Sequence, residues 1–187
     1  MNFNKHYELE GRHAFLSASK YHWLNYDTER LISVYNNTQA IIQGTLLHQF
    51  AYDAIKHGIK LEEKNETLNM YVNDSIDDGM SPEVVLYYSP NAFGTADAIL
   101  FDVDNGYLRI YDLKTGKTPA SIKQLEIYAA LFCLEYNVNP NDIYIHLRIY
   151  QNDEVLIHEP DPEEIWDVMD KIIAFDAVIN DVKMGVA

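Results

Sequence analysis

The dipeptide Asn105-Gly106 restricts the fold of this chain more than any other feature of the sequence. A type I′ turn needs a positive φ at both central residues, and Asn and Gly tolerate that conformation best. The runs on either side are rich in residues that favour strands. We therefore expect two antiparallel strands, Thr95–Asp104 and Tyr107–Lys114, joined by a two-residue turn.

This turn sets a register that brings charged residues together at the open end of the hairpin. Asp104 would lie opposite Tyr107, which places Asp97 opposite Lys114 and Ile99 opposite Asp112. Because side chains alternate between faces, one face is apolar near the turn and charged at the far end. That face would carry Asp97, Ile99, Phe101, Val103, Leu108, Ile110, Asp112 and Lys114.

Asp97 and Asp112 are diagonal neighbours in this register, with backbones about 7–8 Å apart. Two carboxylates on a buried face repel each other and lose hydration, which favours protonation of one of them. A divalent cation such as Mg²⁺, which prefers oxygen ligands, removes this conflict. The alternative is a strand end with two surface charges and a cross-strand ion pair between Asp97 and Lys114.

An ordered series of motifs resembles the PD-(D/E)XK nuclease superfamily in its RecB-like branch. The series is Gly94-Thr95-Ala96-Asp97, Asp112-Leu113-Lys114-Thr115-Gly116 and Gln124-x-x-x-Tyr128. Upstream, His13–Ser19, Trp23-Leu24-Asn25 and Gly44-Thr45-Leu46-Leu47-His48 resemble the N-terminal half of a phage-encoded RecB-like family. The resemblance covers about residues 13 to 136. It implies a restriction-endonuclease-like core and a metal-dependent DNA nuclease, with an exonuclease of phage recombination, replication or end processing as the expected form.

The resemblance also implies roles for individual residues. Asp97 and Asp112 would bind Mg²⁺ or Mn²⁺ together with His48 and the carbonyl oxygen of Leu113. Lys114 would orient the attacking water and stabilise charge on the phosphate, which is a task suited to a fixed ammonium group. Four residues would contact the substrate: Lys117, Lys123, Gln124 and Tyr128. Gln124 and Tyr128 lie one helical turn apart and so share a face.

His48 lies in a segment, Gln39–Lys56, that we expect to be a helix ending at Gly58. Its apolar face would be Ile42, Leu46, Leu47, Phe50 and Ala54. A histidine in such a helix is usually structural. Gly44, one turn earlier, weakens a helix by about 1 kcal/mol relative to Ala, which indicates a close approach to another segment. Together with the Gly-x-x-x-His pattern, this favours His48 as a ligand.

The chain has one cysteine, Cys133, which excludes the four-cysteine iron–sulfur cluster of several RecB-like nucleases. Where relatives often carry Cys-Pro after Trp-Leu-Asn, this sequence has Tyr26-Asp27. We expect Cys133 to be a buried, unreactive residue. His146 and His158 alternate with apolar residues in late strands, and we expect both to be structural.

The formal net charge of −15 argues against a nuclease, because a DNA-binding protein normally presents a basic surface. A local basic field near Arg109, Lys114, Lys117 and Lys123 could offset it. The acidic residues concentrate in 62–78 and 153–170, which we expect to be solvated. The rival hypothesis is a catalytically silent nuclease fold whose acidic surface binds a basic partner or mimics nucleic acid. A third possibility is a subunit that is active only within a larger complex.

The remaining chain predicts one α/β domain, 1–187, with a central mixed sheet flanked by helices. Residues 1–80 would be mainly helical, 84–150 would form the catalytic core, and 161–180 a C-terminal helix. Further expected elements are helices at Ser19–Tyr35 and Ala120–Tyr136, a polar helix or ordered loop at Glu62–Gly79, and strands at Val84–Ser89, Ile143–Tyr150 and Val155–His158. No leader or membrane span is evident. We therefore expect a cytoplasmic protein with DNA as its partner, a phage or host recombination or replication protein as the candidate second partner, and no membrane partner.

Overall fold

A computed structural model of the chain describes residues 4–185. The protein consists of two compact units, Met1–Gln43 and Gly44–Ala187, and helix α1 (Thr28–His57) has residues in both. In the first unit, two short 3-10 helices, Tyr7–Leu9 and Ala18–Asn25, precede α1. The second unit contains the sheet, the other helices and every residue predicted to act in catalysis or metal binding.

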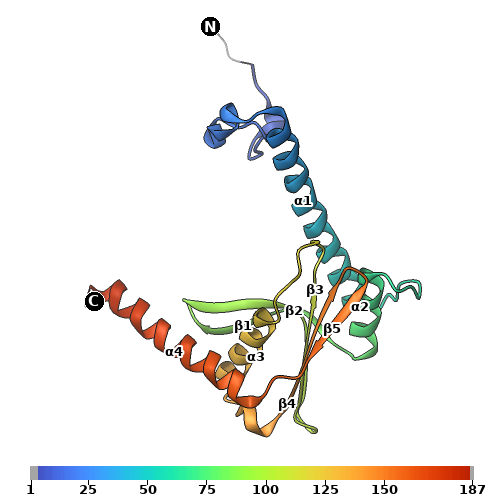
Figure 1. The fold of residues 1–187 in the computed structure, drawn as a ribbon, viewed down its shortest axis with the longest axis vertical. Coiled ribbons are helices and arrows are strands. Elements are labelled where there is room, and N and C mark those ends of the chain that lie inside the picture. Colours follow the sequence, from blue (N-terminus) through green and yellow to red (C-terminus); the bar gives the residue numbers. More distant parts are fainter. Residues whose placement is uncertain (1–3, 186–187) are drawn as a thin grey trace. The chain divides into compact units, whose positions relative to one another are not determined.

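Five strands form one mixed sheet in the order β1-β2-β3-β4-β5 (Figure 1). Their bounds are Ser81–Ser89, Ala92–Asp102, Tyr107–Leu113, Tyr144–Gln151 and Glu154–His158. Only β3 and β4 are parallel to each other, and the other neighbours are antiparallel. A parallel pair needs a crossover connection, which α3 (Lys123–Tyr136) supplies. The prediction of an α/β fold with a mixed sheet flanked by helices is confirmed.

Helices cover the two faces of the sheet differently. On one face lies α3, against which α4 (Pro162–Met184) packs, and on the other face lie α2 (Thr67–Asp77) and the last turns of α1 (Figure 1). The α3 face buries alternate strand residues, including Ile99, Leu108, Ile110, Leu147 and Ile149. The α2 face buries the residues between them, including Ala98, Tyr111, Leu113 and Tyr150. The alternation predicted for the hairpin is therefore confirmed.

The hairpin register differs from the prediction. Asp102 pairs with Tyr107, so the β2–β3 loop contains the four residues 103–106 and not the Asn105-Gly106 dipeptide alone. The carboxylate of Asp102 accepts hydrogen bonds from the amides of Asp104 and Asn105, at 3.1 and 3.2 Å. An aspartate that caps its own loop in this way stabilises the wider connection over the tight turn.

The wider loop shifts the predicted cross-strand pairs by two residues. Ile99 pairs with Ile110 and not with Asp112. Continuing the same count by one residue places Asp97 opposite Asp112 and not opposite Lys114. Because the shift is an even number, each side chain keeps its predicted face. The observed register therefore brings the two aspartates closer together than the diagonal arrangement that the sequence suggests.

The predicted helices Ser19–Tyr35 and Gln39–Lys56 are wrong in their bounds, because α1 runs without a break from Thr28 to His57. Asp27 begins it, and its Oδ1 accepts a hydrogen bond from the amide of Arg30 at 2.8 Å. At the expected break, the hydroxyl of Thr38 donates to the carbonyl oxygen of Val34, at 2.8 Å. Threonine hydroxyls within helices commonly bond to the preceding turn in this way, and α1 continues past Thr38.

The predicted apolar face of this helix is also wrong in part. Gly44, Ala51, Ala54 and Ile55 are the buried residues of α1, whereas the larger apolar side chains are more exposed. The exposed residues are Ile42, Leu46, Leu47 and Phe50. Small residues bring a helix backbone close to its neighbour, so the packed face follows residue size and not hydrophobicity alone.

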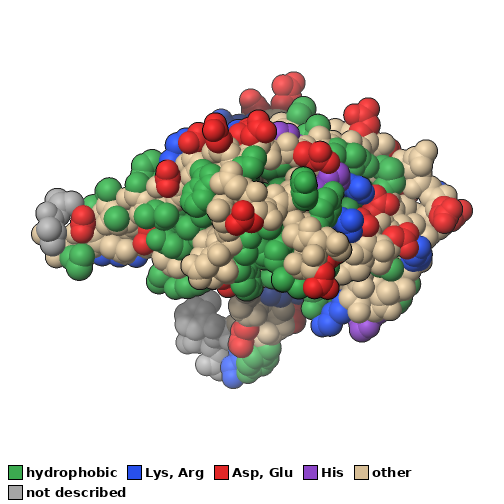
Figure 2. Space-filling view, turned by 90° about the horizontal axis from the view of Figure 1, so that it is seen from below, with side chains coloured by type: hydrophobic (Ala, Val, Ile, Leu, Met, Phe, Trp, Pro, Cys, Tyr) green, Lys and Arg blue, Asp and Glu red, His purple; other side chains and the backbone are tan. Residues whose placement is uncertain are grey.

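The outer surface is strongly acidic, as the composition requires. Figure 2 shows acidic side chains spread over the face in view, with hydrophobic and uncharged areas between them. Within the described residues, no helix is both long enough and apolar enough to cross a bilayer.

Candidate active site

Asp97 on β2 is held by two neighbouring segments. The backbone amide of Leu113 on β3 donates to its Oδ2 at 2.9 Å. The imidazole Nδ1 of His48 on α1 lies 3.5 Å from the same oxygen. His48 and Asp97, which the resemblance gives as ligands of one metal ion, therefore lie next to each other, and the amide of Leu113 adds a contact that the sequence did not indicate.

Asp112 on β3 begins a chain of polar contacts that ends on α3. The Nζ of Lys114 donates to Oδ1 of Asp112 at 3.1 Å and lies 2.9 Å from Oδ2. The same ammonium donates to Oε1 of Gln124 at 2.8 Å. The Nε2 of Gln124 in turn donates to the hydroxyl oxygen of Tyr128 at 3.0 Å. Four residues predicted from two motifs thus form one connected group.

Two motif glycines allow these segments to meet. A Cβ on Gly94 would lie 2.9 Å from Cε1 of Tyr128, and a Cβ on Gly44 would lie 2.7 Å from Oγ1 of Thr115. Both distances are shorter than real Cβ contacts, so each position excludes a side chain unless its neighbour moves. The close approach predicted at Gly44 is confirmed, and its partner is Thr115 in the Asp112–Gly116 motif.

Glu83 on β1 is a further acidic residue of this site, and the sequence reading missed it. Three potential ligand atoms lie within 4.8 Å of one another: a carboxylate oxygen of Glu83, a carboxylate oxygen of Asp97 and an imidazole nitrogen of His48. Glu83 also has a positive φ of 52°, which costs a non-glycine residue free energy. A strained backbone at a cluster of potential ligands indicates a functional constraint.

A bulge in β1 means that counting residues along the sequence places Glu83 on the wrong face of the sheet. Counting outward from the pair of Ser89 and Ala92 at the β1–β2 turn would place Glu83 opposite Ala98, on the other face. The register shifts between Tyr87 and Ser89, and this shift places Glu83 opposite Asp97. A bulge adds one residue to a strand, so every later side chain of that strand changes face relative to its partner strand. The folded hairpin is therefore needed to see that Glu83 joins Asp97 and Asp112.

Two of the carboxylates, those of Asp97 and Asp112, lie in a poorly hydrated environment, whereas Glu83 is exposed. Burial first, and the charge of Asp112 second, raise the pKa of Asp97 from its ordinary 3.8 to about 6. Burial also raises the pKa of Asp112, against the lowering effect of Lys114. Tyr71 lies beneath the cluster. Burial raises its pKa most, followed by the charges of Asp97, Asp112 and Glu83.

The donor set fits a divalent cation. Oδ2 of Asp112 is buried and accepts no directed hydrogen bond from the described residues, although it lies in an ion pair. Lys114 pairs with Asp112, and one ammonium does not balance three carboxylates, so the site has an excess of negative charge. Carboxylates suit Mg²⁺ and Mn²⁺, and the imidazole favours Mn²⁺ over Mg²⁺. The carbonyl oxygen of Leu113 stays a predicted ligand.

The two lysines predicted to contact substrate have different surroundings. Lys117 is exposed in the loop between β3 and α3. Gln151 holds this loop by donating to the carbonyl oxygens of Gly116 and Thr118, at 2.5 and 2.8 Å. Lys123 instead donates to Glu126 at 2.7 Å, so the structure does not bring it into the acidic cluster.

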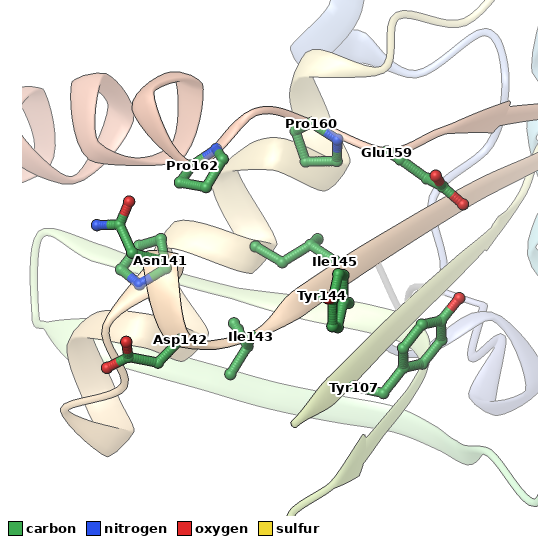
Figure 3. Close-up of a pocket in the computed structure, with 10 residues that line it drawn as sticks. Tyr107, Asn141, Asp142, Ile143, Tyr144, Ile145, Glu159, Pro160 and Pro162 are labelled. Carbon is green, nitrogen blue, oxygen red and sulfur yellow. The ribbon is translucent and has the colours of Figure 1, made fainter. Parts of the chain in front are cut away.

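A separate pocket lies at the other end of β3 and β4. It is lined in part by Tyr107, Tyr144 and Ile145, and the carboxylates of Asp142 and Glu159 lie at its opposite ends (Figure 3). Tyr107 begins β3, whereas Asp112 lies near its last residue. The polar groups of this pocket do not converge, so the acidic cluster is the stronger candidate for chemistry.

Comparisons of the chain with family models, with curated proteins and with solved structures gave no match.

Proposed function

We propose that the chain is a divalent-metal-dependent deoxyribonuclease of the RecB-like PD-(D/E)XK type, with a restriction-endonuclease-like core formed by β1–β4 and α3. An exonuclease acting in phage recombination, replication or DNA end processing is the form that we favour. One observation carries the proposal. The hydrogen-bonded group Asp112–Lys114–Gln124–Tyr128 lies beside the ligand group His48–Glu83–Asp97.

In this proposal His48, Glu83, Asp97 and Asp112 hold the metal ion. A divalent cation, when bound, lowers the pKa of water and polarises a phosphodiester. The protein contributes a fixed constellation before substrate arrives. Asp97 is held by the amide of Leu113, and Asp112 by the ammonium of Lys114, so neither carboxylate must reorganise on binding.

Lys114 is the residue that we propose to act on the phosphate. In hydrolysis a water oxygen bonds to phosphorus, the bond to the leaving sugar oxygen breaks, and a water proton ends on that oxygen. Gln124 and Asp112 hold the ammonium at 2.8 and 2.9 Å. An ammonium positioned in this way stabilises negative charge that develops on the phosphate. Tyr128 accepts from Gln124, so its own hydroxyl hydrogen remains to donate to substrate.

The acidic surface restricts how DNA could bind. Arg109 pairs with Asp78 at 3.2 Å and Lys123 with Glu126, whereas Lys114 contacts the cluster through Asp112 and Lys117 is exposed in the loop that follows β3. Few phosphate contacts imply weak binding with a shallow salt dependence. This favours either a short DNA end as substrate or a basic partner protein that supplies the remaining contacts.

The direct test is incubation of the purified protein with linear, circular and single-stranded DNA, in Mn²⁺ and in chelator. We expect Mn²⁺-dependent degradation of linear DNA, and loss of at least about 100-fold in rate for Asp112→Asn. The matched control is Asp104→Asn, which changes an exposed aspartate in the loop of the same hairpin and should retain the wild-type rate. Equal rates for the two variants would contradict the proposal.

The rival interaction protein is distinguished by metal binding. A silent nuclease fold that binds a basic partner through its acidic surface should not need the ion. Calorimetric titration in which the wild type and Asp112→Asn bind Mn²⁺ equally, together with no degradation of any DNA, favours this rival. Mn²⁺ binding that Asp112→Asn removes, without degradation, favours a subunit that needs a larger complex.

A further inference from the structure

A second group of potential metal ligands lies apart from the acidic cluster. Glu126 on α3, His158 at the end of β5 and Glu164 in the first turn of α4 each offer one ligand atom, and these atoms lie within 4.8 Å of one another. Glu126 is two residues from both Gln124 and Tyr128. It therefore points about 200° around the helix from the face that they share.

Two buried atoms in this group have no hydrogen-bond partner among residues 4–185. They are Oε1 of Glu126 and Nε2 of His158. Glu126 is 1% exposed, and its other oxygen accepts from Lys123 at 2.7 Å. The two unpaired atoms face each other at 3.7 Å, which is too long for a hydrogen bond. Buried polar atoms normally form hydrogen bonds. These two atoms therefore indicate a third group that would bind both of them.

The distances match a cation between the ligands. Two atoms bound to one Zn²⁺ at about 2.0–2.1 Å in tetrahedral geometry lie about 3.4 Å apart. Nε2 of His158 lies 3.7 Å from Oε1 of Glu126 and 3.7 Å from Oε2 of Glu164. A small side-chain adjustment would therefore let both carboxylates and the imidazole contact a single ion.

The hydrogen bonds around these potential ligands are also of the kind found around metal ligands. Oε2 of Glu164 accepts from the amide of Asp161 at 3.1 Å as part of the capping box that begins α4. Lys123 holds the second oxygen of Glu126. Hydrogen bonds of this kind orient metal ligands before binding. The ammonium of Lys123 also lies 3.8 Å from Oε1 of Glu164. One lysine charge thus faces two carboxylate charges among residues 4–185, so one further cation fits the group.

We propose that Glu126, His158 and Glu164 form a second, independent site for a divalent transition metal, with Zn²⁺ as the ion that suits one imidazole and two carboxylates. The ion would join α3, β5 and the start of α4. This proposal goes beyond the proposed nuclease function and does not depend on it. The competing explanation is a protonated His158 that forms ion pairs with the two glutamates and binds no metal.

The test uses the full chain carrying Asp97→Asn, which removes a ligand of the first site. After treatment with chelator, the protein is titrated with Zn²⁺ by calorimetry and with Co²⁺ by visible absorption. We expect one bound ion and the absorption bands of Co²⁺ in low coordination. At free Zn²⁺ one hundred times its Kd, the melting temperature should rise by roughly 5–10 °C.

Three variants in this background locate the ion. His158→Gln and Glu164→Gln should weaken Zn²⁺ binding by more than about 100-fold, and glutamine at 164 can still complete the capping box. Glu163→Gln changes the exposed neighbouring acid and should bind as the background does. No bound ion in the background, or equal affinity in all three variants, would overturn the proposal. If His158→Gln unfolds, Glu164→Gln alone decides.

Discussion

The backbone amide of Leu113 donates a 2.9 Å hydrogen bond to the carboxylate of Asp97. The strand that carries Asp112 therefore fixes the side chain of the acid on the neighbouring strand. Because Asp97 is partly buried, this bond offsets some of the lost hydration. The rest of the desolvation cost raises the free energy of the charged carboxylate of Asp97, and this effect can be measured.

The first prediction concerns pH. Burial raises the pKa of Asp97 from 3.8 to about 6 in the folded protein. The folded state therefore binds this proton more tightly than the unfolded state does. Stability is highest below about pH 4 and falls as pH rises through about 6, by about 2–3 kcal/mol for this group. Urea unfolding of the metal-free protein at several pH values measures the slope. Asp97→Asn should make it shallower, and an unchanged slope would contradict this assignment.

The second prediction concerns the strained acid. Glu83 has a φ of 52°, a conformation that glycine adopts at little cost. Glu83→Gly should therefore stabilise the metal-free protein by roughly 0.5–1 kcal/mol while weakening Mn²⁺ binding. Glu83→Gln keeps the strain and should weaken binding without the gain in stability. Chemical denaturation and calorimetry measure the two effects. Glu83→Gly that binds Mn²⁺ like the wild type would exclude Glu83 as a ligand.

The third prediction concerns the packing of Tyr128. A Cβ on Gly94 would lie 2.9 Å from Cε1 of this half-buried ring, so the ring would have to move. Gly94→Ala should destabilise the protein by about 1–3 kcal/mol and displace the hydroxyl from Gln124. The control is Gly116→Ala, where a Cβ meets no atom within 4 Å. We expect Gly116→Ala to unfold at the same denaturant concentration as the wild type. An equal loss of stability in both variants would refute the packing argument.

The fourth prediction concerns Gly44 and Thr115. Alanine favours a helix over glycine by about 1 kcal/mol, but here its Cβ would lie 2.7 Å from Oγ1 of Thr115. Gly44→Ala alone should therefore be destabilising, whereas Gly44→Ala combined with Thr115→Ala should recover stability. A double-mutant cycle should give a coupling of about 0.5–3 kcal/mol between the two positions. Additive effects would show that the two residues do not press on each other.

Local patterns were sufficient for much of the fold. Alternating residues predicted the strands and their faces, and Asp161-Pro162 with the following acids predicted the start of α4, where the structure has a capping box. Cys133 is buried as expected, and burial raises the pKa of its thiol to about 12. These features depend on residues adjacent in sequence, whose steric and hydrogen-bonding preferences act whatever the rest of the chain does.

Long-range geometry decided what the sequence could not. The ordered motifs were enough to select His48, Asp97, Asp112, Lys114, Gln124 and Tyr128 as one group. They did not indicate the four-residue loop that sets Asp97 against Asp112, nor the continuous α1. Glu83 entered the site through a bulge in β1, and His158 met Glu126 and Glu164 only where three elements pack. Register and packing depend on the energy of many distant contacts at once, so they appear only when the whole chain is folded.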